Sequence, residues 1–280
     1  MTQLSKRIRI LIVDDCVCIR TTLRAMLNSD EYIVAGELSS GENLIATIAM
    51  LNPDIICLDH LLPNKDGMHL LSEIRTAYPN LPVVMITGSD DTTLQHVAAM
   101  LGIDGFIYKP FSQKKIFDVL QEITHAKKQL MILSRQYSFP EGNTCHTKAV
   151  VADDSRTVRR LLITILTQMG IEVVGEAYDG MQAIELITEH KPDITCLDFE
   201  MPTMNGLEAL KIIRSKNDTT KIIMTTTLAS RELFKQAVSA GALGYIIKPF
   251  YPDTLKQNIS RILTHDSKNN YKSKLLNVDS

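Results

Sequence analysis

Five polar residues in the first half of the chain have the chemistry to hold a cation and a phosphate together: Asp14, Asp15, Asp59, Thr87 and Lys109. Three carboxylates gathered at one place repel each other strongly unless a cation lies among them. Oxygen ligands without histidine or cysteine suit a hard ion, and a few carboxylates with room for water and phosphate favour Mg2+ over Ca2+. A lysine can hold a phosphoryl oxygen as a point charge, and a threonine hydroxyl can donate a hydrogen bond to another. These residue types therefore indicate magnesium-assisted phosphate chemistry, provided that the fold brings them together.

The same five residue types recur 139 residues downstream, as Asp153, Asp154, Asp198, Thr226 and Lys248. The same shift relates several further pairs: segments 53–59 and 192–198, Pro63 and Pro202, Gly67 and Gly206, Gly105 and Gly244, and the Lys-Pro-Phe segments 109–111 and 248–250. The period is far too long for a solenoid, so each copy is predicted to be a whole domain.

Each copy must position its polar residues through alternating strands and helices. In the first copy we expect strands at 8–13, 32–38, 55–58, 83–86 and 106–108, and helices around 19–27 and at 43–51, 68–76, 92–101 and 113–124. Five strands alternating with five helices predict parallel βαβ units with right-handed crossovers, and so an α/β fold with two doubly wound parallel sheets in tandem. Ligands bind such sheets at the carboxyl ends of the strands, which is where all five polar residues fall.

We expect the domains to span residues 5–126 and 147–265, with a linker at 127–146 and a solvated tail at 266–280. The first part of that linker is a candidate extension of the last helix of copy one. With 280 residues the chain is long enough for two independent cores, and 45% hydrophobic with 22% charged residues is typical of a soluble globular protein.

Composition argues against several classes of function. A net charge of -2 gives no basic footprint for nucleic acid or for an anionic membrane. The apolar run at 10–13 is too short for a signal peptide or a membrane span. Of the five cysteines, Cys57 and Cys196 lie in strand-like runs, where a thiol acts as a small core hydrophobe, and no cysteine cluster completes a zinc site. A reducing cytoplasm fits this pattern best.

The two sets of five polar residues resemble the receiver domain of bacterial two-component response regulators. In each set a proline and a glycine follow the third aspartate: Pro63 and Gly67 after Asp59, and Pro202 and Gly206 after Asp198. The resemblance covers nearly the whole chain as two copies, and it implies two flavodoxin-like (βα)5 domains with strand order 2-1-3-4-5. It also implies that Asp59 and Asp198 accept phosphate from a phosphohistidine on a sensor histidine kinase or a histidine phosphotransfer protein.

The resemblance further implies Mg2+ as the cofactor of each copy. Its ligands would be Asp14 (through water), Asp15, Asp59 and the backbone carbonyl of Leu61 in copy one, and Asp153 (through water), Asp154, Asp198 and the backbone carbonyl of Glu200 in copy two. The phosphoryl group would be contacted by Thr87 and Lys109 in copy one and by Thr226 and Lys248 in copy two.

Two aromatic residues match a switch position of that family. Phe106 and Tyr245 stand three residues before the lysines, where the family keeps an aromatic that turns inward when the threonine moves toward phosphate. Each could equally be an ordinary core or surface aromatic. The resemblance also implies a cis peptide bond between the lysine and the proline that follows it.

Positions that border the path of the hydrolytic water in this family differ between the copies. The second residue after the acceptor is Leu61 in copy one and Glu200 in copy two, and the second residue after the threonine is Ser89 or Leu228. We therefore expect the two phosphoaspartates to have different lifetimes. His60, beside the first acceptor, is interpreted as an accidental neighbour.

Our leading interpretation is a response regulator that catalyses only its own phosphotransfer and autodephosphorylation. No DNA-binding or catalytic output domain is visible after the second copy, so its output is expected to be phosphorylation-dependent protein binding or a phosphorelay. Contact between receivers or within a homodimer through the helix 4–strand 5–helix 5 faces is a further expectation. Two alternatives stay open: an adaptor or phosphate sink with one phosphorylated receiver, and a Mg2+-dependent aspartyl phosphohydrolase.

Overall fold

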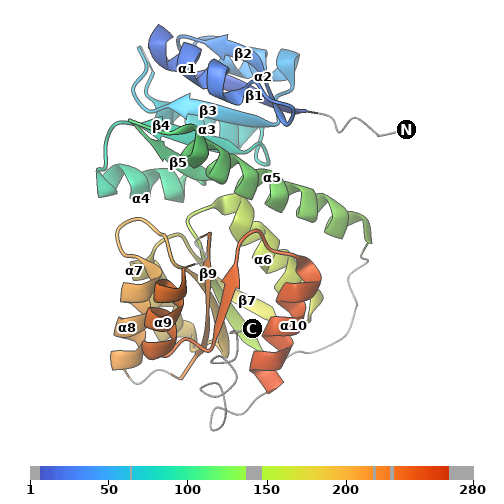
Figure 1. Cartoon of the computed structure of the whole chain (residues 1–280), viewed down its shortest axis with the longest axis vertical. Coiled ribbons are helices and arrows are strands. Elements are labelled where there is room, and N and C mark those ends of the chain that lie inside the picture. The colour runs from blue at the N-terminus through green and yellow to red at the C-terminus, as the bar shows by residue number, and fades with distance from the viewer. Residues whose placement is uncertain (1–6, 64, 137–146, 217–218, 228–229, 265–280) are drawn as a thin grey trace. The chain divides into compact units, whose positions relative to one another are not determined.

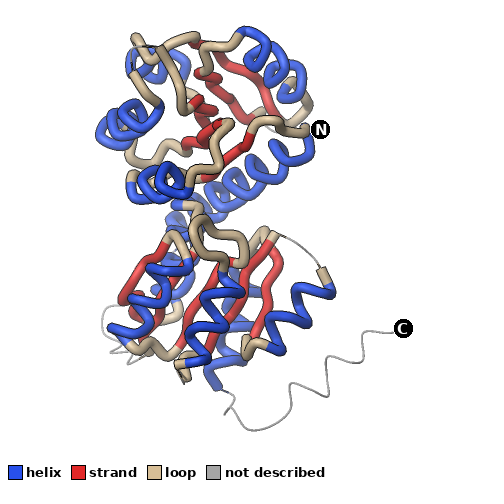
Figure 2. Tube along the Cα trace, turned by 90° about the vertical axis from the view of Figure 1, so that its left-hand side faces the viewer, coloured by secondary structure: helices blue, strands red, loops and turns tan. Residues whose placement is uncertain are grey.

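The computed structural model describes residues 7–63, 65–136, 147–216, 219–227 and 230–264. The chain divides into two compact units, one made of residues 1–124 with 155–157 and the other of residues 125–154 with 158–280. In each unit a parallel sheet lies between two layers of helices (Figures 1 and 2).

The first unit is built around five strands in the order β2-β1-β3-β4-β5. The strands are β1 (Ile8–Val13), β2 (Tyr32–Leu38), β3 (Ile55–Asp59), β4 (Val83–Thr87) and β5 (Gly105–Tyr108). The helices are α1 (Val17–Leu27), α2 (Leu44–Leu51), α3 (Gly67–Ala77), α4 (Thr92–Met100) and α5 (Gln113–Gln136). All strand pairs are parallel, and the strand order matches the order 2-1-3-4-5 that the resemblance implied.

Burial explains why these segments form a sheet between helices. Every residue of β3 and of β4 is buried, as expected for central strands covered on both faces. Successive side chains point to opposite faces, so Ile10 and Ile12 pack with α1 and α5 while Leu11 and Val13 pack with α2, α3 and α4. The two faces thus form two hydrophobic layers, and the polar residues remain at the strand ends.

The second unit repeats this arrangement, with the strand order β7-β6-β8-β9-β10. The strands are β6 (Lys148–Ala152), β7 (Glu172–Ala177), β8 (Ile194–Asp198), β9 (Lys221–Thr226) and β10 (Gly244–Ile247). The helices are α6 (Arg156–Gln168), α7 (Gly180–His190), α8 (Gly206–Ser215), α9 (Arg231–Ser239) and α10 (Pro252–Thr264). Even the register shift in β1, between Ile10 and Leu11, recurs in β6 between Ala149 and Val150.

Helix α5 continues beyond the predicted end of the first domain, which confirms that the first part of the predicted linker extends the last helix of copy one. It runs to Gln136, so residues 127–136 of the predicted linker are helical, and residues 137–146 lie outside the described part of the chain. From His125 onward the helix belongs to the second unit, where Ala126 and Leu133 are buried against residues of α6 and α10. The predicted tail, 266–280, also lies outside the described residues.

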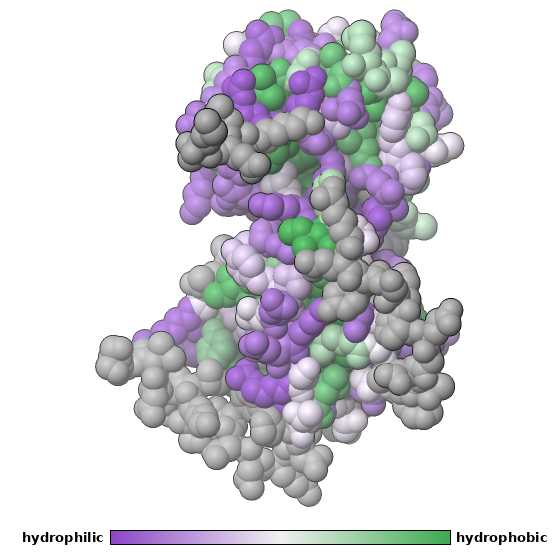
Figure 3. Space-filling view, turned by 90° about the vertical axis from the view of Figure 1, so that its right-hand side faces the viewer, coloured by the Kyte–Doolittle hydropathy of each residue, from purple (hydrophilic) through white to green (hydrophobic). Residues whose placement is uncertain are grey.

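Among the described residues some large apolar side chains are exposed, such as Met50, Leu61 and Met100. Figure 3 shows apolar and hydrophilic residues intermixed on the face that it presents. Within the described residues, no helix has both the length and the apolar character needed to cross a membrane.

Candidate functional site

The carboxyl ends of four strands bring the predicted residues of the first unit together. Asp14 and Asp15 directly follow β1, Asp59 ends β3, Thr87 ends β4, and Lys109 directly follows β5. Because β1, β3, β4 and β5 are parallel neighbours, their carboxyl ends meet at one edge of the sheet. The five residues predicted from spacing alone therefore share one edge.

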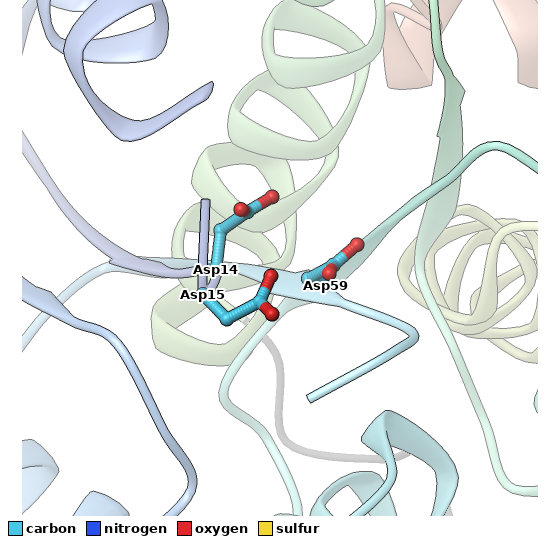
Figure 4. A group of neighbouring side chains, drawn as sticks. All are labelled: Asp14, Asp15 and Asp59. Carbon is cyan, nitrogen blue, oxygen red and sulfur yellow. The ribbon is translucent and has the colours of Figure 1, made fainter. Parts of the chain in front are cut away.

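The lysine of the first unit bridges two of the three acids. Lys109 Nζ lies 2.9 Å from Asp14 Oδ2 and 2.8 Å from Asp59 Oδ1. Asp14 is fully buried and Asp59 is 5% exposed, whereas Asp15 is exposed. Carboxylate oxygens of all three acids lie within 4.8 Å of one another, and Figure 4 shows the three side chains gathered where β1 and β3 end. The cluster offers hard oxygen donors without histidine or sulfur, which fits a magnesium ion.

Burial and charge together set the ionisation of this cluster. Burial raises the pKa of the Asp59 carboxyl, the hydrogen bond from Lys109 opposes that rise, and the charge of Asp14 adds to it. Burial lowers the pKa of the Lys109 ammonium, but its hydrogen bonds to Asp59 and Asp14 outweigh burial, so its net pKa is raised. The lysine thus stays protonated and offsets part of the acids' mutual repulsion.

The second unit contains the same cluster in a more enclosed form. Asp153 and Asp154 follow β6, Asp198 ends β8, and Lys248 follows β10. Lys248 Nζ lies 2.8 Å from Asp153 Oδ2 and 3.2 Å from Asp198 Oδ1, and the carboxylates again lie within 4.8 Å of one another. The side chain of Lys248 is 4% exposed, against 24% for Lys109.

A glycine lets the next helix approach each acceptor position closely. A Cβ atom at Gly67 would lie 2.4 Å from the carbonyl oxygen of Asp59, and one at Gly206 would lie 1.9 Å from that of Asp198. Each glycine begins its helix directly after an N-cap residue, Asp66 or Asn205, whose side chain accepts a backbone hydrogen bond from the first turn. The glycines paired by the repeat thus have a steric reason to be there.

The threonine and aromatic positions differ between the units. Thr87 Oγ1 accepts a hydrogen bond from the Ser89 backbone nitrogen at 3.0 Å, and Phe106 is 7% exposed. In the second unit, Tyr245 is half-buried and makes a side-chain hydrogen bond with Thr226. Burial raises the pKa of the Tyr245 hydroxyl, and that hydrogen bond partly opposes the rise.

The residues two positions after each acceptor also have different surroundings. Leu61 is 70% exposed, whereas Glu200 Oε2 accepts a hydrogen bond from Thr227 Oγ1 at 3.0 Å. Leu228 lies outside the described residues. The peptide bonds from Lys109 to Pro110 and from Lys248 to Pro249 are both cis, as expected.

The structure adds an arginine and a glutamate to the surroundings of each site, and the sequence analysis did not single them out. They are Arg20 and Glu37 in the first unit and Arg159 and Glu176 in the second. Arg20 on α1 and Arg159 on α6 donate to backbone carbonyls of the acid pairs, and each forms an ion pair with a glutamate, Glu37 or Glu176. Both pairs obey the 139-residue offset, so the repeat itself was the signal that could have found them.

Comparisons with known proteins show what each half of the chain is similar to. A family model described as "Response regulator receiver domain" matches residues 10–121 and 149–260. The chemotaxis protein CheY of Thermotoga maritima is 36% identical over 115 residues, which cover 41% of this chain and 96% of that protein. The transcriptional regulatory protein PdtaR of Mycobacterium tuberculosis is 39% identical over 103 residues, which cover 37% of this chain and 50% of that protein. Among solved structures, the CheX-CheY-BeF3-Mg+2 complex of Borrelia burgdorferi matches with 27% identity and a TM-score of 0.42, covering 42% of this chain and 90% of the other.

Proposed function

We propose that this chain, which belongs to the response regulator receiver family, accepts a phosphoryl group on Asp59 and on Asp198 and signals in the cytoplasm by changing its protein partners or by relaying the phosphate. The donor would be a phosphohistidine on a sensor histidine kinase or a histidine phosphotransfer protein. The chain would catalyse only its own phosphotransfer and autodephosphorylation.

The observation that carries this proposal is the ammonium group held between two carboxylates in each unit. Lys109 and Lys248 each contact the first acid of the pair and the acceptor within 3.2 Å. That position suits a group which leaves the acceptor to bind an oxygen of a new phosphoryl group. Phosphoryl transfer needs mostly positioning and charge neutralisation, and both are built into this edge of the sheet.

Asp59 and Asp198 would act as nucleophiles without a general base, because a carboxylate is already ionised at neutral pH. A carboxylate oxygen forms the new bond to phosphorus while the bond between phosphorus and the donor imidazole breaks. Magnesium, held by the acid clusters with the carbonyls of Leu61 and Glu200, would neutralise charge on the phosphoryl oxygens.

The threonine would carry the signal from the site to the partner-binding face. Once phosphate is present, the hydroxyl of Thr87 or Thr226 would bind a phosphoryl oxygen. In the second unit Thr226 already shares a hydrogen bond with Tyr245, so movement of Thr226 toward phosphate would act directly on the aromatic side chain. In the first unit Phe106 is already buried and has no hydroxyl, so only packing couples it to Thr87.

The face formed by α4 and β5 supports partner binding in the first unit. Val97 and Met100 of α4 are 41% and 65% exposed, and Tyr108 of β5, 37% exposed, stacks on Phe106 with ring centroids 6.1 Å apart. Movement of Phe106 would therefore change this apolar surface, which is of the kind that binds protein partners.

Intact mass spectrometry after incubation with acetyl phosphate and Mg2+ tests this proposal. We expect up to two phosphate adducts on the unmodified chain, one on Asp59→Asn or Asp198→Asn, and none on the double variant. Asp193→Asn is the matched control, because Asp193 lies just before β8, at the opposite end of the strand from Asp198, and accepts a hydrogen bond from the Lys148 backbone. It should keep both adducts.

The same experiment separates the alternatives. One adduct that only a single acceptor variant abolishes would indicate an adaptor with one active receiver. Steady release of phosphate from small substrates without accumulation of an adduct would indicate a phosphohydrolase. Adducts that survive in the double variant would refute the proposal.

A further inference from the structure

An arginine lies behind the acid pair in both units and holds the backbone of that pair. Arg20 Nη1 donates to the carbonyl oxygens of Asp14 at 2.7 Å and of Asp15 at 3.0 Å. In the second unit, Arg159 Nη1 donates to the carbonyl oxygens of Asp153 at 2.7 Å and of Asp154 at 3.2 Å. One guanidinium nitrogen thus spans two consecutive peptide groups, and it does so independently in two units.

A glutamate on the neighbouring strand forms an ion pair with each arginine. Arg20 Nε lies 3.5 Å from Glu37 Oε2 on β2, and Arg159 Nε lies 3.7 Å from Glu176 Oε2 on β7. The arginine side chains are 15% and 8% exposed. Each is the fourth residue of its helix, so the helix, the loop with the acid pair and the edge strand meet at this guanidinium.

We propose that Arg20 and Arg159 are positioning residues for the cation site, an inference that rests on the proposed function. Fixing two consecutive carbonyl groups fixes the backbone from which both carboxylates of the pair project. Magnesium demands near-octahedral ligand geometry, so its affinity depends on how well those carboxylates are oriented beforehand. Groups that orient metal ligands from behind typically contribute ten- to a hundred-fold in metal affinity.

The sign of the effect separates positioning from simple electrostatics. A positive guanidinium beside the site repels a divalent cation, so charge alone would make Mg2+ bind more tightly once the arginine is neutralised. Positioning predicts the opposite, that Mg2+ binds more weakly. A charge-conserving lysine has a single nitrogen and cannot contact the carbonyl groups and the glutamate from two separate nitrogens, as Nη1 and Nε of arginine do, so it should restore affinity only in part.

Calorimetric titration of the full chain with Mg2+ measures this effect. A background Asp15→Asn confines binding to the second unit, and Arg159→Gln and Arg159→Lys are then compared with that background. We expect the dissociation constant for Mg2+ to rise roughly ten- to a hundred-fold in Arg159→Gln and less in Arg159→Lys.

The matched control is Arg214→Gln, which removes an equivalent pair of backbone contacts from the opposite edge of the same sheet. Arg214 donates to the carbonyl oxygens of Thr220 at 2.8 Å and Gly241 at 3.1 Å, which lie before β9 and β10. This variant should unfold at a lower temperature but bind Mg2+ as the background does. Circular dichroism establishes that each variant is folded, and Arg20→Gln in an Asp154→Asn background replaces any second-unit variant that is not.

Unchanged or tighter Mg2+ binding by folded arginine variants would overturn the positioning role and leave the proposed function intact. Equal weakening by Arg214→Gln would also overturn it, because the effect would then be a general loss of stability. Failure of the background chain to bind Mg2+ at all would overturn both the positioning role and the magnesium-dependent function on which it rests.

Discussion

Replacing the lysine of each site by methionine should destabilise the second unit more than the first. Lys248 is 4% exposed and contacts acids that are 0% and 3% exposed, whereas Lys109 is 24% exposed. Methionine keeps much of the apolar stem but leaves the neighbouring carboxylates without their counter-charge. Removing one partner of a buried ion pair costs about 3–5 kcal/mol, whereas a fully exposed pair contributes about 0–1 kcal/mol.

We therefore expect Lys248→Met to lower the free energy of unfolding of its unit by about 3–5 kcal/mol, and Lys109→Met by roughly 1–3 kcal/mol because solvent screens its site. The difference, about 2 kcal/mol, corresponds to roughly a 30-fold change in the unfolding equilibrium. Magnesium should restore more stability to each variant than to the unmodified chain, because the cation replaces the missing positive charge and binds without competition from the ammonium.

Hydrogen–deuterium exchange, followed by mass spectrometry in EDTA and then in Mg2+, gives a separate free energy for each unit. Lys221→Met is the control in the second unit, because its ammonium contacts the Leu263 carbonyl at 3.0 Å rather than carboxylates. It should cost about 1 kcal/mol and show no extra recovery with Mg2+. If Lys109→Met proved as costly as Lys248→Met, or Mg2+ restored nothing, our account of charge balance at these sites would be wrong.

Three further predictions concern separate features. Thr225 is fully buried, and its hydroxyl has no hydrogen-bond partner among the described residues, so Thr225→Val should stabilise the second unit by about 1 kcal/mol in urea unfolding; a loss of stability would contradict this. Burial raises the pKa of the Cys57 and Cys196 thiols to about 12, so iodoacetamide at pH 8 should leave both unmodified in the folded chain, and peptide mapping would reveal any error. Because folding raises these pKa values, the contribution of the two thiols to the free energy of unfolding is fully present below about pH 9. It is lost as the pH rises toward 12. Leu61 and Glu200 border their acceptors differently, so phosphate should decay at different rates from the two single-acceptor variants, and equal rates would count against this assignment.

The sequence predicted the sheet and the gathering of the polar side chains at its edge, because both depend on local signals repeated twice. Short β-branched runs mark the buried strands, and an acid, threonine or lysine stands where each relevant strand ends. Since parallel strands place those ends at one edge, spacing along the chain was enough to bring Asp59 and Lys109 together. The cis bond after each lysine followed from the family resemblance and was confirmed.

Features that depend on tertiary packing were harder to predict. The segment after Thr124 mixes polar residues, among them His125, Lys127 and Lys128, with the apolar run 130–133, so the sequence marks its first part only as a candidate extension of the helix. Its helical structure is stabilised by burial of Ala126 and Leu133 in the core of the second unit, which no local pattern indicates. The enclosure of Lys248 relative to Lys109 likewise depends on neighbours that the repeat, nearly identical at these positions, could not distinguish.

The most direct test of the central claim is an anomalous difference map from crystals of the full chain grown with Mn2+ in place of Mg2+. Our account predicts one peak in each unit, among Asp14, Asp15 and Asp59 in the first and among Asp153, Asp154 and Asp198 in the second. Peaks elsewhere, or none at either carboxylate cluster at saturating Mn2+, would contradict it.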